Sequence, residues 1–320
     1  MSDDIQNIKS ASLWRDAWKR LLRNRLAVFG MVVLATMVVA VVIGPMIIKW
    51  ATGFTYDLIP AERDLVRAAA PSLSHLMGTD DAGRDILARV LQGGRISLMV
   101  GIISTAVSLI IGVSYGAIAG FRGGYIDNIM MRIVDILFSI PYILIVIVLL
   151  SVFGGPNTPQ WIKWLSMQLG GAGNQGLSQI FLLFFALGLV SWLTMARVVR
   201  GQILSLKNQE FVLAARATGV SNFGIIFRHL IPNALGPVIV YATLTVPSVM
   251  LTEAFLSFLG LGVQAPFASW GSLAADGIKN VAIFPWQLIF PGATMALTLF
   301  SLNFLGDGLR DALDPQTRKF

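Results

Sequence analysis

The sequence lacks cysteine altogether and has only two histidines among its 320 residues. Without cysteine the chain has no disulfides, thiolate metal sites or cysteine nucleophiles. The two histidines lie far apart in the sequence and form no HExxH pattern, which makes a zinc peptidase a poor candidate. The sequence also contains no Gly-Lys dipeptide and therefore no P-loop for ATP. We predict that the chain is not an enzyme and holds no metal or cofactor of its own.

Charged residues are also scarce, at 13% of the sequence, whereas hydrophobic residues make up 55%. A soluble domain carries about 25% charged residues. A surface this poor in charge must be covered largely by lipid, and the mean hydropathy of +0.73 agrees with that. The net charge of +7 does not indicate nucleic-acid binding, because the basic residues flank apolar runs. The composition therefore predicts an integral membrane protein.

Six apolar stretches are long enough to cross a bilayer as helices, which takes about 20 residues each. The first is longer than the apolar core of a signal peptide and has no small-residue cleavage pattern after it, so we expect it to be retained. About twice as many Lys and Arg residues lie on the side of the N-terminus as on the other side, which places both termini in the cytoplasm. The predicted spans are 26–48, 96–120, 129–153, 177–195, 234–258 and 287–305.

The spans divide the chain into five regions of an all-α integral membrane protein. The first of these regions is amphipathic, with Leu and Trp at helical spacing opposite basic residues. This pattern predicts a helix that lies at the membrane interface on the cytoplasmic side. The regions are the interfacial helix (1–25), the first transmembrane helix (26–48), a periplasmic loop (49–95), a permease core (96–306) with a cytoplasmic coupling loop (197–232), and a cytoplasmic tail (307–320).

Two carboxylates fall inside predicted spans, Asp135 in the third and Glu253 in the fifth. A carboxylate at membrane depth either lines a water-filled path or hydrogen-bonds a neighbouring helix, and the sequence leaves both readings open. Proline also interrupts these two spans, at Pro141 and Pro247. Asp135, Pro141, Pro247 and Glu253 are therefore the candidate residues of a translocation pathway.

The loop between the fourth and fifth spans has its own local signals. Residues 211–217 favour a short helix with small side chains, and Gly219 can end that helix in a left-handed cap. Ser221 can cap a second helix, and Pro232 marks the beginning of the fifth span. A short helix with an alanine face, held between two spans, fits a groove on another protein. Its rigid flanks would transmit the motion of that partner.

This loop resembles the EAA motif of ABC importer permeases. Ala214, Ala215, Gly219 and Pro232 occupy matching positions, whereas Leu213 stands where the motif has its Glu. Further segments resemble the peptide and nickel branch of these permeases, above all the oligopeptide permease C (OppC) group and next the dipeptide permease (DppC) group. They read RNRLA (23–27), GTD (78–80), GRD (83–85), GRISL (94–98), RH (228–229), PN (232–233), EAFLSFLGLG (253–262), SWG (269–271) and GDGLRDALDP (306–315).

The resemblance implies a type I importer core of the methionine-importer kind, in the bacterial cytoplasmic (inner) membrane. It implies a second permease (OppB-like), two ABC ATPases (OppD/OppF-like) that bind ATP and Mg, and an extracytoplasmic peptide-binding protein (OppA-like). The chain would form half of the pathway for an oligopeptide, and the loop would couple to one ATPase. The coupling residues so implied are Glu210, Phe211, Leu213, Ala214, Ala215, Arg216, Gly219 and Pro232.

Two alternatives remain open at this point. The first is the permease of a related importer for dipeptides, nickel or other peptides. The second is an ion-coupled secondary transporter that works alone, for which the loop would be an ordinary surface helix.

Overall fold

The computed structural model describes residues 13–61, 66–154, 160, 164 and 175–313. The regular secondary structure of these residues is helical, apart from one isolated bridge between Thr79 and Asp85, and the helices are joined by turns and irregular loops. The helices are α1 (Leu13–Arg23), α2 (Arg25–Thr52), α4 (Ile86–Arg122), α5 (Gly124–Ser139), α6 (Tyr142–Gly154), α8 (Gln175–Leu206), α9 (Glu210–Ala217), α10 (Asn222–Gly224), the π-helix η1 (Ile225–Leu230), α11 (Ile231–Phe258), α12 (Trp270–Lys279) and α13 (Trp286–Leu313).

Five helices of the described chain are long and apolar enough to cross a membrane, and a sixth span is formed if α5 and α6 count as one bent pair. The predicted third span, 129–153, is therefore not one straight helix. Its halves meet at an angle of 86°. Proline disfavours the helical conformation of the residue before it, and Ile140, before Pro141, is extended with φ −85° and ψ 128°.

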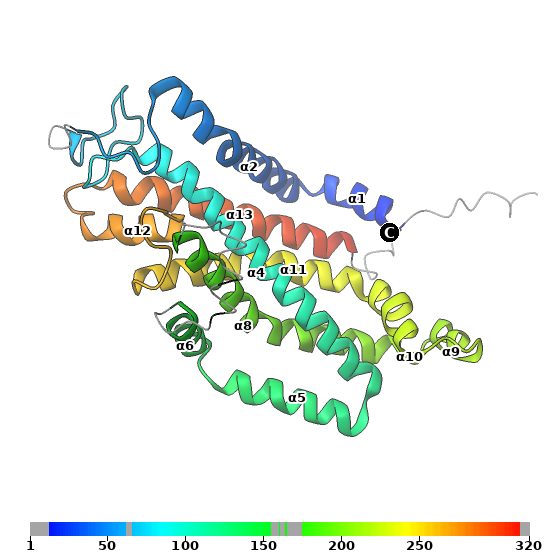
Figure 1. Ribbon diagram of the computed structural model, residues 1–320. Coiled ribbons are helices and arrows are strands. Elements are labelled where there is room, and N and C mark those ends of the chain that lie inside the picture. The colour runs from blue at the N-terminus through cyan, green and yellow to red at the C-terminus, as the bar shows by residue number, and fades with distance from the viewer. Residues whose placement is uncertain (1–12, 62–65, 155–159, 161–163, 165–174, 314–320) are drawn as a thin grey trace, which may run out of the picture.

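The spans lie side by side in an elongated bundle with two distinct ends (Figure 1). One end, which we call the coupling end, carries α1, the α4–α5 connection, α9 and the last turns of α13. The opposite end, which we call the loop end, carries residues 53–61 and 66–85 and helix α12. The first and last described helices therefore return to the same end as α9. An even number of crossings, as predicted, produces this arrangement.

The central contact of the bundle is between α4 and α8, and it depends on small residues. Gly112, Gly116 and Gly120 recur every fourth residue of α4, so they share one face of that helix. A Cβ added at any of them would come within about 3 Å of atoms of α8. Glycines at this spacing let two helix backbones approach closely inside a membrane. The α4–α8 pair is thus the rigid centre to which the coupling end is attached.

Several helix ends differ from the predicted region boundaries. Helix α4 begins at Ile86, inside the predicted periplasmic loop, because the Asp85 side chain accepts a hydrogen bond from Ala88 N at 2.8 Å and caps it. Helix α8 continues to Leu206, inside the predicted coupling loop. Helix α13 continues to Leu313, beyond the predicted core. Amphipathic and charged turns at these ends extend the spans past their apolar parts.

The fifth span begins earlier than predicted. The helix is continuous from Asn222 to Phe258, with Pro232 inside it. Proline has no N–H and its ring crowds the carbonyl one turn earlier. The preceding turn, Ile225–Leu230, is a wider π-helix. Such single-turn π segments occur where the regular hydrogen-bond ladder is interrupted. Pro232 therefore marks an irregular turn within the helix and not its first residue.

Candidate coupling site and membrane path

Helix α9 has an inner and an outer face. Val212 (0% exposed) and Ala215 (7% exposed) point inward and pack in a cluster with Ile203 of α8. Phe211 and Leu213 are 37% and 52% exposed. The inward residues attach α9 to the bundle, and the outward residues remain available to another protein.

The two alanines of the predicted docking face thus lie on different faces. Ala214 is exposed and Ala215 is buried against the chain itself. Consecutive helical residues point about 100° apart, so two adjacent alanines cannot form one outward face. Ala215 must be small because of packing within this chain. Glu210 and Arg216 are both exposed, at the first and last turns of α9, where their charges suit the helix dipole.

The caps of α9 and α10 follow the sequence signals. Gly219 has φ +80°, in the left-handed region, and its N–H donates to the Arg216 carbonyl at 3.0 Å. The Thr218 hydroxyl donates to the carbonyl of Ala215 at 3.0 Å. The Ser221 hydroxyl accepts from Gly224 N at 3.2 Å and caps the next helix. These caps set a tight turn between α9 and the fifth span.

Charged side chains fasten the coupling end to the central helices. Asp127 of α5 forms a bidentate ion pair with Arg200 of α8, at 2.5 Å to Nε and 2.7 Å to Nη2. Lys207 Nζ donates to the Gly120 carbonyl at the end of α4, at 3.1 Å. The Arg216 guanidinium of α9 lies over the Phe121 ring, 5.4 Å from its centroid. A displacement of α9 would consequently reach α4, α5 and α8 together.

The break between α5 and α6 borders a cavity of about 400 Å³. Pro141 is among its lining residues. Asp135 lies on α5 and forms an ion pair with Arg197 of α8, with Asp135 Oδ1 2.7 Å from Arg197 Nη2. The Arg197 guanidinium also lies 4.0 Å from the centroid of the Phe138 ring, which lines the cavity. Two of the four predicted pathway residues, Asp135 and Pro141, are thus found at or beside this cavity.

Glu253 lies elsewhere and is only 1% exposed. Its Oε1 accepts hydrogen bonds from Ser257 Oγ at 2.8 Å and from Ser269 Oγ at 2.7 Å. Ser269 is also the N-cap of α12. Of the two roles left open by the sequence, this geometry favours hydrogen bonding to a neighbouring segment. Pro247 is buried within the same helix, α11.

The residue after Ser269 completes this attachment of α12. Trp270 is fully buried, its backbone N–H donates to Ser97 Oγ at 2.9 Å, and its indole Nε1 donates to the Val90 carbonyl at 2.8 Å. The sequence analysis missed this role. The signal was present, because Ser269-Trp270-Gly271 is a capping residue followed by a large aromatic residue and a glycine. We call Glu253, Ser257, Ser269 and Trp270 the α12 latch.

The loop end is held by a second polar cluster. Asp80 accepts from Arg84 Nε at 2.8 Å and from Arg89 Nη1 at 2.5 Å. His75 Nδ1 lies 2.9 Å from Asp85 Oδ2, and both side chains are buried. Gln287 Nε2 of α13 donates to Asp81 Oδ1 at 3.2 Å. The segments GTD and GRD therefore fold the loop onto the beginnings of α4 and α13.

Aromatic packing holds the first part of this loop. The Tyr56 ring stacks on Phe267, with centroids 6.0 Å apart. Burial, and secondarily the carboxylate of Asp57, raises the pKa of the Tyr56 phenol, so this side chain remains neutral at physiological pH. The loop end thus presents a folded cover over the spans.

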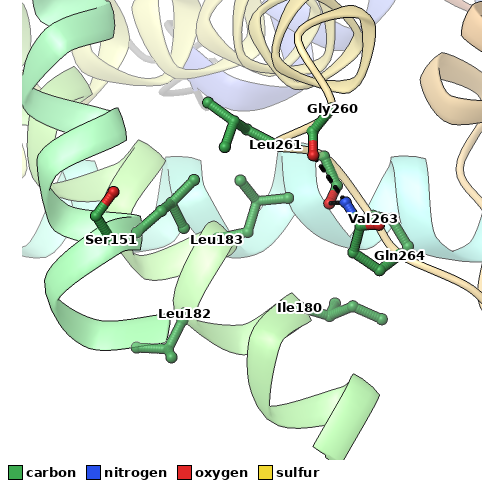
Figure 2. Close-up of a pocket in the computed structure, with 10 residues that line it drawn as sticks. Ser151, Ile180, Leu182, Leu183, Gly260, Leu261, Val263 and Gln264 are labelled. Carbon is green, nitrogen blue, oxygen red and sulfur yellow. Dashed lines mark hydrogen bonds between the residues drawn. The ribbon is translucent and has the colours of Figure 1, made fainter. Parts of the chain in front are cut away.

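A smaller cavity of about 180 Å³ lies near the loop end, between α6, the first turns of α8 and the segment after α11 (Figure 2). Its walls are mostly leucine, isoleucine and valine. The Gln264 amide donates to the carbonyls of Gly260 at 2.9 Å and Gly262 at 3.3 Å, shown as dashed lines in Figure 2. Because these bonds use the N–H groups of the Gln264 amide and most of the wall is aliphatic, the cavity is mainly apolar and offers few polar contacts to a ligand.

Comparison with known proteins identifies the family. Residues 112–319 match the family described as the inner membrane component of binding-protein-dependent transport systems. The chain belongs to this family. Residues 12–64 match a second description, the N-terminal transmembrane domain of oligopeptide transport permease C. The predicted fold class, an all-α multi-spanning importer permease, is confirmed, and so is its location in the membrane.

Individual relatives are similar over nearly the whole chain. The oligopeptide transport system permease OppC of Haemophilus influenzae is 46% identical, covering 97% of this chain and 91% of the relative. The dipeptide transport system permease DppC of Bacillus subtilis is 43% identical, covering 97% and 88%. Among solved structures, an inward-facing form of the MetNI methionine ABC transporter has a TM-score of 0.49 and 17% identity, covering 70% of this chain and 96% of that one.

Proposed function

We propose that this chain is a permease subunit of an ATP-driven oligopeptide importer, in which it forms half of the translocation pathway. It would pair with a second permease and receive peptide from an extracytoplasmic binding protein. Two cytoplasmic ATPase subunits would bind ATP and Mg and supply the energy. This chain would contribute mechanical coupling and a path, and no catalytic group.

The two-faced helix α9 carries the proposal. Its outer side chains, Phe211 and Leu213, are exposed apolar groups at an end of the bundle that predicted topology places in water. Two aromatic residues of the segment that follows, Phe223 of α10 and Phe227 of η1, are 69% and 38% exposed, and their tilted rings lie with centroids 4.3 Å apart. Exposed apolar groups that gather at an aqueous surface indicate a protein interface. An ATPase docked here would move α8 and the fifth span through the inner face of α9.

The cargo is proposed from the relatives and from the cavity at the broken span. The relatives named above include an oligopeptide and a dipeptide permease at similar identity. The residues lining the 400 Å³ cavity are uncharged within the described part of the chain. A wall without fixed charges suits substrates whose side chains vary, such as oligopeptides, with the selection made mainly by the binding protein.

A pair of substitutions on opposite faces of α9 tests the coupling role. Leu213→Glu changes an exposed side chain, so we expect normal insertion and assembly with the second permease but loss of the ATPase subunits and of uptake. Ala215→Glu places a charge in a buried cluster, so we expect α9 to detach and the whole chain to become less stable. Co-purification of each tagged variant, followed by peptide uptake in proteoliposomes, measures both results. Full uptake by Leu213→Glu would contradict the docking role.

Reconstitution of the chain alone tests the alternative of an ion-coupled transporter. A lone chain reconstituted in liposomes with a proton or sodium gradient should not accumulate peptide, because coupling energy enters through α9. Gradient-driven uptake by the lone chain would replace our proposal with that alternative.

A further inference from the structure

The broken third span exposes backbone at membrane depth beside a cavity lined by hydroxyl groups. Irregular backbone within a bilayer is tolerated where protein buries it or where it lines a water-filled space. Here Ile140, Pro141 and Tyr142, the residues of the break, all line the 400 Å³ cavity. Five hydroxyl-bearing residues, from α6, α8 and α11, line the same cavity: Tyr142, Ser191, Thr194, Ser248 and Thr252.

Two of these hydroxyl groups already donate their protons to carbonyl groups of their own helices. Ser191 Oγ donates to the Leu187 carbonyl at 2.9 Å, and Thr252 Oγ1 donates to the Ser248 carbonyl at 3.0 Å. Their oxygens keep lone pairs that accept hydrogen bonds. The Tyr142 hydroxyl lies 3.4 Å from Thr252 Oγ1, across the gap between α6 and α11. The Ser191 and Thr252 oxygens can therefore accept hydrogen bonds from N–H groups of a ligand, whatever side chains the ligand carries.

An exposed ion pair lies one helical turn beyond this wall, toward the coupling end. Arg197 follows Thr194 by three residues on α8, and Asp135 precedes Phe138 by three on α5. The side chains of Arg197 and Asp135 are 43% and 56% exposed. Asp135 lies eleven residues beyond Gly124, which is about 16 Å along the helix. Exposed charges at such depth face water or protein and not lipid.

We propose that the cavity and this ion pair form a peptide subsite that binds the main chain and the charged termini of the cargo. This inference rests on the proposed importer function and deepens it. The hydroxyl oxygens accept from peptide N–H groups. Arg197 binds the terminal carboxylate when that end of the peptide reaches the pair, and Asp135 binds the terminal ammonium when the other end does. Because an exposed ion pair contributes little to stability, the two side chains separate readily to exchange partners. Because these groups are common to all peptides, the subsite would not select for particular side chains.

Transport of peptides with blocked termini tests the role of each charge. The complete importer is reconstituted with its binding protein, and uptake of tetra-alanine is compared with uptake of its C-terminal amide and its N-acetyl form. Each uptake is divided by the wild-type value for the same peptide, so that the preference of the binding protein cancels. Arg197→Gln should lower uptake of the free peptide about tenfold, the loss expected for one charge-assisted hydrogen bond, and change uptake of the amide less than about twofold.

Asp135→Asn should give the complementary pattern, with the N-acetyl peptide little affected. Arg132→Gln is the matched control, because Arg132 is exposed on the same helix and is not among the lining residues of the cavity. It should leave all three ratios near one. Equal losses for every peptide with Arg197→Gln would show that the pair is structural, and unchanged uptake would show that it binds no terminus. Either result overturns the proposal. If the wild-type complex imports none of the three peptides, the importer function itself fails.

The absence of native cysteine allows a second test that does not depend on transport. A single Thr194→Cys should react with a water-soluble maleimide, and peptide-loaded binding protein with ATP should slow the reaction. The control is Ile110→Cys, on the outer surface of α4, where Ile110 is 71% exposed. If that thiol faces lipid, it reacts far more slowly. A Thr194→Cys thiol that stays unreactive in the folded, cycling complex, or that peptide does not protect, would overturn the proposed site.

Discussion

Substitutions at Glu253 distinguish two roles for its carboxylate, a structural role in the α12 latch and a role in lining the pathway. In the α12 latch a single oxygen, Glu253 Oε1, accepts from Ser257 Oγ and Ser269 Oγ, and all three side chains are buried. Glu253→Ala removes that acceptor and leaves two buried hydroxyls without it. Each orphaned group costs about 1–3 kcal/mol, so the two hydroxyls together cost about 2–6 kcal/mol, and the new cavity adds to that loss.

Glu253→Gln changes much less. The glutamine amide has nearly the same volume, and its oxygen can accept both serine hydroxyls. We therefore expect a change in stability within about 1 kcal/mol and near-normal peptide uptake. Ser257→Ala loses one hydrogen bond and should fall between the two, at about 1 kcal/mol.

The assay is the apparent unfolding temperature of the purified complex in detergent, measured for all three variants together with peptide uptake. The predicted order of stability is wild type close to Glu253→Gln, then Ser257→Ala, then Glu253→Ala. A Glu253→Gln variant as unstable as Glu253→Ala would mean that the negative charge itself is required. A stable Glu253→Gln variant with no uptake would show that the carboxylate is needed for transport and would place Glu253 in the translocation pathway.

Two further predictions concern the coupling end. Gly219→Pro should abolish uptake, because proline fixes φ near −65° whereas Gly219 has φ +80°, and Gly219→Asn should retain most uptake because asparagine tolerates the left-handed region. Uptake by the proline variant would contradict the tight turn after α9. Arg200→Gln should lower stability by about 2–3 kcal/mol, because it leaves the Asp127 side chain, which is only 7% exposed, without its counter-charge. Adding Asp127→Asn should recover part of that loss in the same unfolding measurement, and no recovery would show that the pair matters through packing alone.

The spans and the caps could be predicted because they depend on neighbouring residues. Apolar runs of about 20 residues identify helices that cross a bilayer, and Pro141 was visible as an irregularity in one of them. The left-handed Gly219 and the capping Ser221 were predicted because their local chemistry favours few other conformations. The sequence could not give the 86° bend, since a proline permits many angles and packing selects one.

The contacts of the candidate site could not be predicted because they join distant residues. Arg197 and Asp135 are 62 positions apart, and Ser269 is 16 residues from Glu253. Which alanine of α9 points inward depends on how that helix packs on α8, and the sequence pattern assigned Ala214 and Ala215 to one face. Local sequence signals thus predicted the helices and their caps, whereas the pairs of polar groups between helices could be identified only from the folded structure.

The most direct test of the importer account is purification of the tagged chain from its native membrane, followed by an ATPase assay of the purified material. We expect a second permease and two ATPase subunits to co-purify, and peptide-loaded binding protein to stimulate ATP hydrolysis. Recovery of the chain alone, with peptide transport driven by an ion gradient and unaffected by ATP, would contradict the account.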